Sequence, residues 1–120
     1  VGETMGQCYT AFTIGDDGSL SERRTWAEVQ GTAPDGCSLD DDGAIWFANA
    51  AAPEVVRVAE GGEILERRAT PQSAFACILG GEDGRTLFVL TSPGFTADSA
   101  GSAAGAIWTT RVDSPGAGLP

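Results

Sequence analysis

Residues 10–24 read TAFTIGDDGSLSERR, and residues 54–68 read EVVRVAEGGEILERR. The two stretches start 44 residues apart, and each runs from an apolar strand through a turn into a second strand that ends in Glu-Arg-Arg. A second match, 40 residues apart, aligns DGCSL at 35–39 with FACIL at 75–79. Two interlocking matches with a period in the low forties, and four short strands per unit, indicate the blades of a β-propeller.

The rest of the chain is punctuated in the same way. Seventeen Gly and six Pro separate short β-like runs, and no stretch keeps a helical period over three turns. We therefore expect an all-β chain, in which the acidic run at 40–42 is a solvated hairpin turn. The expected strands lie near residues 10–14, 19–28, 36–40, 44–48, 54–59, 63–69, 75–79, 86–91 and 105–112.

The repeat also predicts how these strands are grouped. Blade segments are expected at about residues 1–30, 31–70 and 71–113, followed by a loose, turn-like C-terminal tail at 114–120. Propellers close with about four to eight blades, so two to three blades cannot close alone. The chain is then the C-terminal part of a longer protein, one of several copies that complete a ring, or a compact sandwich. The start at Val1, directly before a strand, favours the first of these.

Composition excludes several classes of function. The net charge is −10, from 17 Asp and Glu against 7 basic residues, which argues against nucleic acid as a partner. The chain has no His, so a Ser-His-Asp triad, a His-ligated zinc and a His general base are excluded within it. No apolar run reaches the ~18 residues of a membrane span, so no membrane partner is expected. Three widely spaced cysteines are typical of reduced thiols and predict a cytoplasmic protein.

A series of short motifs runs from residue 34 to the end of the chain. PDGCSLD at residues 34–40 is followed by DGAIW at 42–46. Weaker motifs follow: VRV at 56–58, CILGG at 77–81, TLFV at 86–89, GAIW at 105–108 and GLP at 118–120. Taken together, they resemble the C-terminal part of the gluconolactonase/regucalcin-like (senescence marker protein, SMP-30) lactonases.

This resemblance implies a six-bladed propeller with one divalent cation (Ca, Zn, Mg or Mn) in its mouth, where sugar lactones or related esters are hydrolysed. The cation ligands of that family are a Glu from the first blade, an Asn from a middle blade and the Asp of Pro-Asp-Gly. Only the last matches a position here, Asp35, which is also the candidate general base. Because two expected ligands are missing, whether this chain is an enzyme stays open. The alternative is a catalytically incomplete propeller segment that acts only as an assembly or binding module.

The residues alone leave both candidate site positions open. A hard cation needs several oxygen ligands, and Asp35 supplies one, but Asp before Gly also caps turns in most proteins. Phe75 occupies the position of Asp35 in the following blade, because Cys77 matches Cys37. Phe75 is therefore a candidate for an apolar, substrate-binding wall beside Asp35, with core packing between blades as the alternative.

Overall fold

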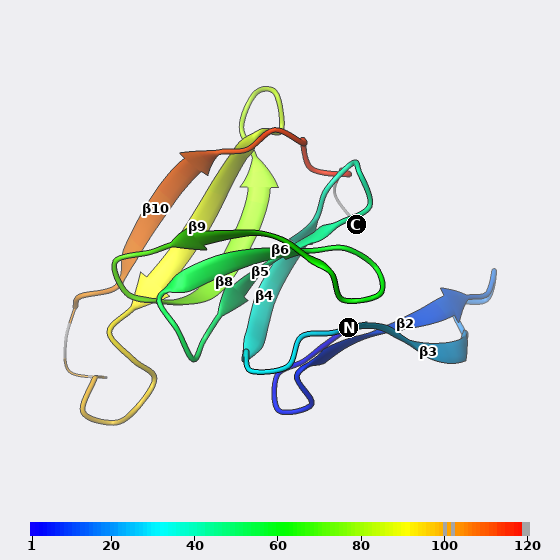
Figure 1. Ribbon diagram of the computed structural model, residues 1–120, viewed down its shortest axis with the longest axis horizontal. Helices are drawn as coiled ribbons and strands as arrows, with labels where there is room; N and C mark the ends of the chain where they lie inside the picture. Colours follow the sequence, from blue (N-terminus) through cyan, green and yellow to red (C-terminus); the bar gives the residue numbers. More distant parts are fainter. Residues whose placement is uncertain (100, 102, 119–120) are drawn as a thin grey trace.

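The computed structural model describes residues 1–99, 101 and 103–118, and in this part every regular element is a β-strand (Figure 1). The predicted all-β class is confirmed. Each expected strand lies within two residues of its predicted bounds, and the short strand β1 was not predicted. No helix long and apolar enough to cross a membrane occurs among these residues.

The strands form three antiparallel sheets. The first sheet has the order β1 (Gly2–Glu3), β2 (Cys8–Ile14), β3 (Leu20–Glu28). The middle sheet has the order β4 (Pro34–Leu39), β5 (Ile45–Asn49), β6 (Glu54–Val58), β7 (Ile64–Ala69). The third sheet has the order β10 (Ala106–Arg111), β9 (Thr86–Ser92), β8 (Ser73–Gly80). Sequential strands are therefore neighbours in each sheet, which is the arrangement of a propeller blade.

The sequence repeat is visible in the hydrogen bonds of two turns. Between β2 and β3, Gly18 donates its N–H to the carbonyl of Gly15 at 2.8 Å. Between β6 and β7, Gly62 donates to the carbonyl of Ala59 at 3.0 Å. Gly18 has φ 80° and Gly62 has φ 97°, a left-handed conformation that glycine adopts without steric cost. The same turn thus recurs 44 residues later because glycine stands at the same place.

The middle sheet is packed on both faces. Side chains alternate along a strand, so Trp46 and Ala48 of β5 face the third sheet while Phe47 faces the first. The core between the middle and third sheets contains Trp46, Ala48, Val55, Ala74, Cys77, Leu79, Leu87, Val89 and Val112. The core between the first and middle sheets contains Tyr9, Ala27, Val29, Phe47, Val56 and Val58. Two separate cores therefore hold three stacked blades together.

The C-terminal tail is attached to two sheets. Asp41 donates its N–H to the carbonyl of Pro115 at 2.9 Å, and Gly116 donates to the carbonyl of Gly84 at 3.0 Å. These contacts join the β4–β5 turn of the middle sheet to the β8–β9 turn of the third. The expectation of a loose tail is therefore wrong for residues 114–117, while residues 119–120 lie outside the described part.

The acidic β4–β5 turn is also less solvated than expected. Asp40 is only 1% exposed, and its carboxylate accepts a hydrogen bond from Arg57 Nε at 2.7 Å. It accepts two more from the backbone N–H groups of Ala44, at 2.9 Å, and Asp42, at 3.1 Å. The prediction of a solvated turn is thus wrong for Asp40, which forms a buried ion pair across the end of the middle sheet.

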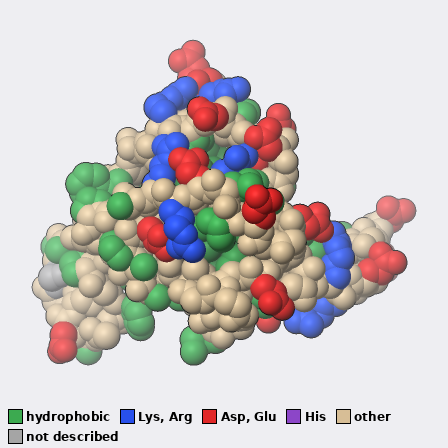
Figure 2. Space-filling model, viewed as in Figure 1, with side chains coloured by type: hydrophobic (Ala, Val, Ile, Leu, Met, Phe, Trp, Pro, Cys, Tyr) green, Lys and Arg blue, Asp and Glu red, His purple; other side chains and the backbone are tan. Residues whose placement is uncertain are grey.

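All seven arginines are held by neighbouring oxygen atoms, and Figure 2 shows Arg and acidic side chains mixed over the surface. Six of them form ion pairs: Arg23–Glu3, Arg24–Glu60, Arg57–Asp40, Arg67–Glu54, Arg68–Glu66 and Arg111–Asp83. The seventh, Arg85, donates to the carbonyl of Asp113. The few positive charges of this acidic chain are therefore already neutralised or bonded within it.

Candidate functional site

The strand that carries Asp35 has an irregularity at that residue. The pairing of β4 with β5 shifts between Pro34 and Cys37, so that Asp35 and Gly36 together oppose the single residue Ala48. Such a β-bulge bends a strand and redirects its side chains, and bulges are common beside active sites. Asp35 is exposed at this bend.

The corresponding strand of the third sheet bulges at the same place in the repeat. The pairing of β8 with β9 shifts between Ala74 and Ala76, which leaves Phe75 as the extra residue. Phe75 is half-buried. The two positions that were singled out from the repeat, Asp35 and Phe75, are thus bulged residues of β4 and β8. These two strands lie against each other and are called the innermost strands below.

Gly36 brings these two strands unusually close. A Cβ atom at this position would lie 2.7 Å from the Cα of Ala76 and 3.2 Å from the carbonyl oxygen of Phe75. The thiol of Cys77 also donates to the carbonyl of Gly36 at 3.5 Å, and burial raises its pKa to about 12, which keeps the thiol protonated. The backbones at Asp35 and Phe75 are therefore neighbours at the same end of the two sheets.

We expect Gly36→Ala to disturb this approach. The added methyl group meets backbone atoms rather than a flexible side chain, so the two strands must separate, at a cost of about 1–3 kcal/mol. Urea unfolding of the polypeptide that carries this chain measures the loss. Gly105→Ala is the matched control, since its methyl group would lie 3.5 Å from the nearest atom, an ordinary contact. Equal stability of the two variants would contradict the close packing of the strands.

The carboxylate of Asp35 is available to a ligand. Among the hydrogen bonds and ion pairs of the described residues, none engages this carboxylate. An exposed, unpaired carboxylate is a suitable ligand for a hard divalent cation. In the described part of the chain, however, no three Cys, Asp or Glu side chains converge. Asp35 therefore fits such a cation as one ligand, and the remaining ligands have to come from elsewhere.

A buried amide holds the start of the Asp35 strand in place. Asn49, 1% exposed, accepts a hydrogen bond from the N–H of Ala33 at 3.0 Å through its side-chain oxygen. The hydroxyl of Thr4 donates to the carbonyl of Pro34 at 2.7 Å. Ala33 and Pro34 are thus held in place by Asn49 of β5 and by Thr4 of the turn after β1. Sequence reasoning missed Asn49, although an Asn directly after an apolar strand is a common sign of such a turn contact.

A second aromatic ring accompanies Phe75. The ring of Phe95, from the segment after β9, packs edge-to-face on Phe75 with the centroids 6.0 Å apart and the planes at 74°. The sequence predicted no strand between residues 91 and 105, and no role was assigned to Phe95. Nothing in the local pattern relates the two rings, because their contact depends on the path of the segment in space.

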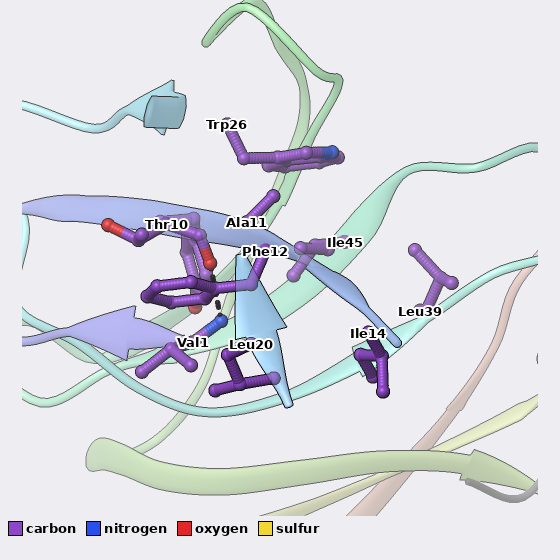
Figure 3. A pocket seen from close by; sticks show the side chains of 10 residues that line it. Val1, Thr10, Ala11, Phe12, Ile14, Leu20, Trp26, Leu39 and Ile45 are labelled. Carbon is purple, nitrogen blue, oxygen red and sulfur yellow. Dashed lines mark hydrogen bonds between the residues drawn. The ribbon is translucent and has the colours of Figure 1, made fainter. Parts of the chain in front are cut away.

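An apolar hollow of about 330 Å³ lies between the first and middle sheets, away from Asp35. Figure 3 shows Phe12, Ile14, Leu20 and Leu39 around it. Leu39 ends β4, whereas Asp35 lies near its beginning, so the hollow is at the opposite end of that strand. Neither Asp35 nor Phe75 lines it.

The chain is similar to known proteins in sequence and in fold. A family model described as the SMP-30/Gluconolactonase/LRE-like region matches residues 1–93. A 6-deoxy-6-sulfogluconolactonase of Pseudomonas putida is 30% identical over 125 residues, covering 98% of this chain and 43% of that protein. The chain thus spans less than half the length of this relative.

Two solved structures are similar in fold. The luciferin-regenerating enzyme has a TM-score of 0.79 at 17% identity, and the calcium-binding protein regucalcin of Agrobacterium tumefaciens has 0.76 at 20% identity. Each likeness covers 94% of this chain and 41% of the other protein. At these identities the comparison concerns the fold, and it confirms the prediction that the three sheets are blades of a propeller.

Proposed function

Because this chain belongs to the SMP-30/gluconolactonase/LRE-like family, we propose that it is part of a hydrolase that opens sugar lactones or related esters with one divalent cation. The resemblance identified from the PDGCSLD and DGAIW motifs is thereby confirmed. The observation that supports the proposal best is the exposed Asp35 carboxylate, which no other described residue engages, at a bulge of an innermost strand. An unneutralised carboxylate directed by a bulge suits both cation binding and proton abstraction.

In this proposal the residues of the chain have distinct tasks. Asp35 would hold a divalent cation through one carboxylate oxygen, and its carboxylate accepts the proton of the attacking water. A bound divalent cation would supply Lewis acidity toward the lactone carbonyl. Phe75, the neighbouring bulged residue, forms an apolar wall that excludes water from one side of the lactone. Asn49 and Thr4 keep the backbone before Asp35 in position.

The cation is Ca, Zn, Mg or Mn. A carboxylate oxygen is a ligand that all four accept, and hard cations with oxygen ligands are typical of sites without His or Cys. Regucalcin, one of the similar structures, is described as a calcium-binding protein, which makes Ca²⁺ the first ion to test.

The rest of the site is proposed to come from remaining propeller blades or from other copies of the chain. Ile14 is 72% exposed and Leu20 59%, beside the apolar hollow of Figure 3. Large apolar side chains grouped in this way are typical of surfaces that another part of a protein covers.

The three cysteines are free thiols, which supports a cytoplasmic location. A module for assembly alone would leave the free carboxylate of Asp35 without a role.

A lactone assay with metal removal tests the proposal. The polypeptide that contains this chain, with its other blades, is expected to hydrolyse glucono-1,5-lactone faster than buffer does. EDTA is expected to abolish this excess rate, and Ca²⁺, Zn²⁺, Mg²⁺ or Mn²⁺ to restore it, because the carbonyl is no longer polarised without the cation. Proton release in a pH-stat measures both rates. An excess rate that EDTA leaves unchanged would exclude metal dependence, and no excess rate on any sugar lactone or ester would favour the assembly module.

A further inference from the structure

The segment after β9 extends the apolar wall beyond Phe75. Phe95 is 81% exposed, yet its ring is held by the edge-to-face contact with Phe75. Phe75 is itself fixed by the β8 bulge and by the packing of β8 against β4. The two phenyl rings form a small apolar surface, in which the ring of Phe75 is fixed and the ring of Phe95 is open to a ligand.

This surface lies at the same end of the blades as Asp35. Ser73 at the start of β8 pairs with Ser92 at the end of β9, so the segment that carries Phe95 leaves the sheet where β8 begins. The start of β4 also lies toward the lower side of the view in Figure 1, and Gly36 near this start lies against Ala76 of β8. The backbone beside Asp35 is thus in contact with the backbone of Phe75, and a lactone whose carbonyl is at Asp35 would extend from β4 toward the strand that carries these rings.

The segment that carries Phe95 has no basic side chain. Residues 92–105 read SPGFTADSAGSAAG, in which Asp98 is the one ionisable side chain. All seven arginines are engaged by other oxygen atoms, and the lower left of Figure 2 shows no basic side chain on the face in view. Among the described residues of this segment an anionic substituent such as a sulfonate would find no cation, whereas an alkyl or aryl group would cover the exposed ring of Phe95.

We infer that Phe95 determines substrate specificity by binding an apolar substituent of the lactone, so that the preferred substrate is an alkyl- or aryl-substituted lactone. The inference rests on the proposed lactonase activity at Asp35. Phe95 contacts the substituent and not the reacting atoms. It therefore changes the preference between lactones and leaves the chemical step unaltered.

A pair of lactones with the same ring tests this role. In the complete polypeptide, Phe95→Ala is expected to lower kcat/KM for a phenyl-substituted δ-valerolactone about tenfold and to change kcat/KM for glucono-1,5-lactone less than twofold. Phe95→Leu keeps an apolar side chain and is expected to recover most of the loss. Phe12→Ala, at the opposite end of the blades, is the matched control and should affect both lactones equally. An equal effect of Phe95→Ala on the two lactones, or no effect on either, would overturn the inference.

A binding measurement separates this inference from the proposed activity. Calorimetry with a phenyl-substituted δ-lactam, which is not hydrolysed under these conditions, compares the wild-type protein with Phe95→Ala. Binding that weakens about tenfold in the variant supports the apolar site, even if no lactone is hydrolysed and the proposed activity fails. Equal binding by both proteins, or no binding by either, overturns the apolar site even if lactones are hydrolysed.

Discussion

Asp35→Asn is expected to lower kcat for lactone hydrolysis by about 10²–10⁴-fold in the polypeptide that carries this chain. Asparagine has the shape of aspartate, so the β4 bulge keeps its geometry. It has no negative charge for a cation and cannot take a proton from water at neutral pH. The initial rate at saturating glucono-1,5-lactone measures the effect, and calorimetric titration with Ca²⁺ measures the accompanying loss of cation affinity.

Asp16→Asn is the matched control for this experiment. Asp16 is an exposed carboxylate in the β2–β3 turn, remote from β4, and removing its charge changes the net charge by the same amount. Its rate and cation affinity should equal those of the wild type. If Asp35→Asn kept the activity and the affinity of this control, Asp35 would be the cap of a turn, and the site would have to be sought on other strands.

Asp40→Asn is expected to reduce the free energy of unfolding by about 3–5 kcal/mol. The substitution removes the buried negative partner of Arg57, whose side chain is only 18% exposed, and leaves the exposed Asp42 carboxylate as the remaining ionic partner of this largely buried charge. The hydrogen bond that Arg57 donates to Asp40 is the main reason why the pKa of Arg57 is raised above its usual range, so Arg57 does not escape by losing its proton. Urea unfolding at pH 7, followed by tryptophan fluorescence, gives the difference.

Asp42→Asn provides the comparison within the same turn. Asp42 also bonds to Arg57, at 2.9 Å, but its side chain is 65% exposed, so water and salt replace the interaction at little cost. The expected change is much smaller than that of Asp40→Asn. Similar losses for the two variants would mean that Asp40 is not buried in solution and that the turn is solvated after all.

The sequence predicted only some of the residues of the candidate site. The alignment of Cys37 with Cys77 placed Asp35 and Phe75 at equivalent positions, and both are the bulged residues of innermost strands. Their catalytic and substrate-binding roles remain proposals. Asn49 and Phe95 were missed because their contacts join segments that share no local pattern, such as the 6.0 Å contact between the rings of Phe75 and Phe95.

The sequence by itself determined the all-β class, the strands and the blade repeat. These follow from properties that act over a few residues: side-chain alternation in strands, and glycines such as Gly18 and Gly62 where a turn needs a positive φ. Only the tertiary structure decided that Asp40 is buried, that residues 114–117 join two sheets, and that Gly36 lets β8 approach β4. Each of these depends on contacts between residues distant in the chain. Burial and close approach are therefore set by how the blades pack, and the strand pattern alone does not contain them.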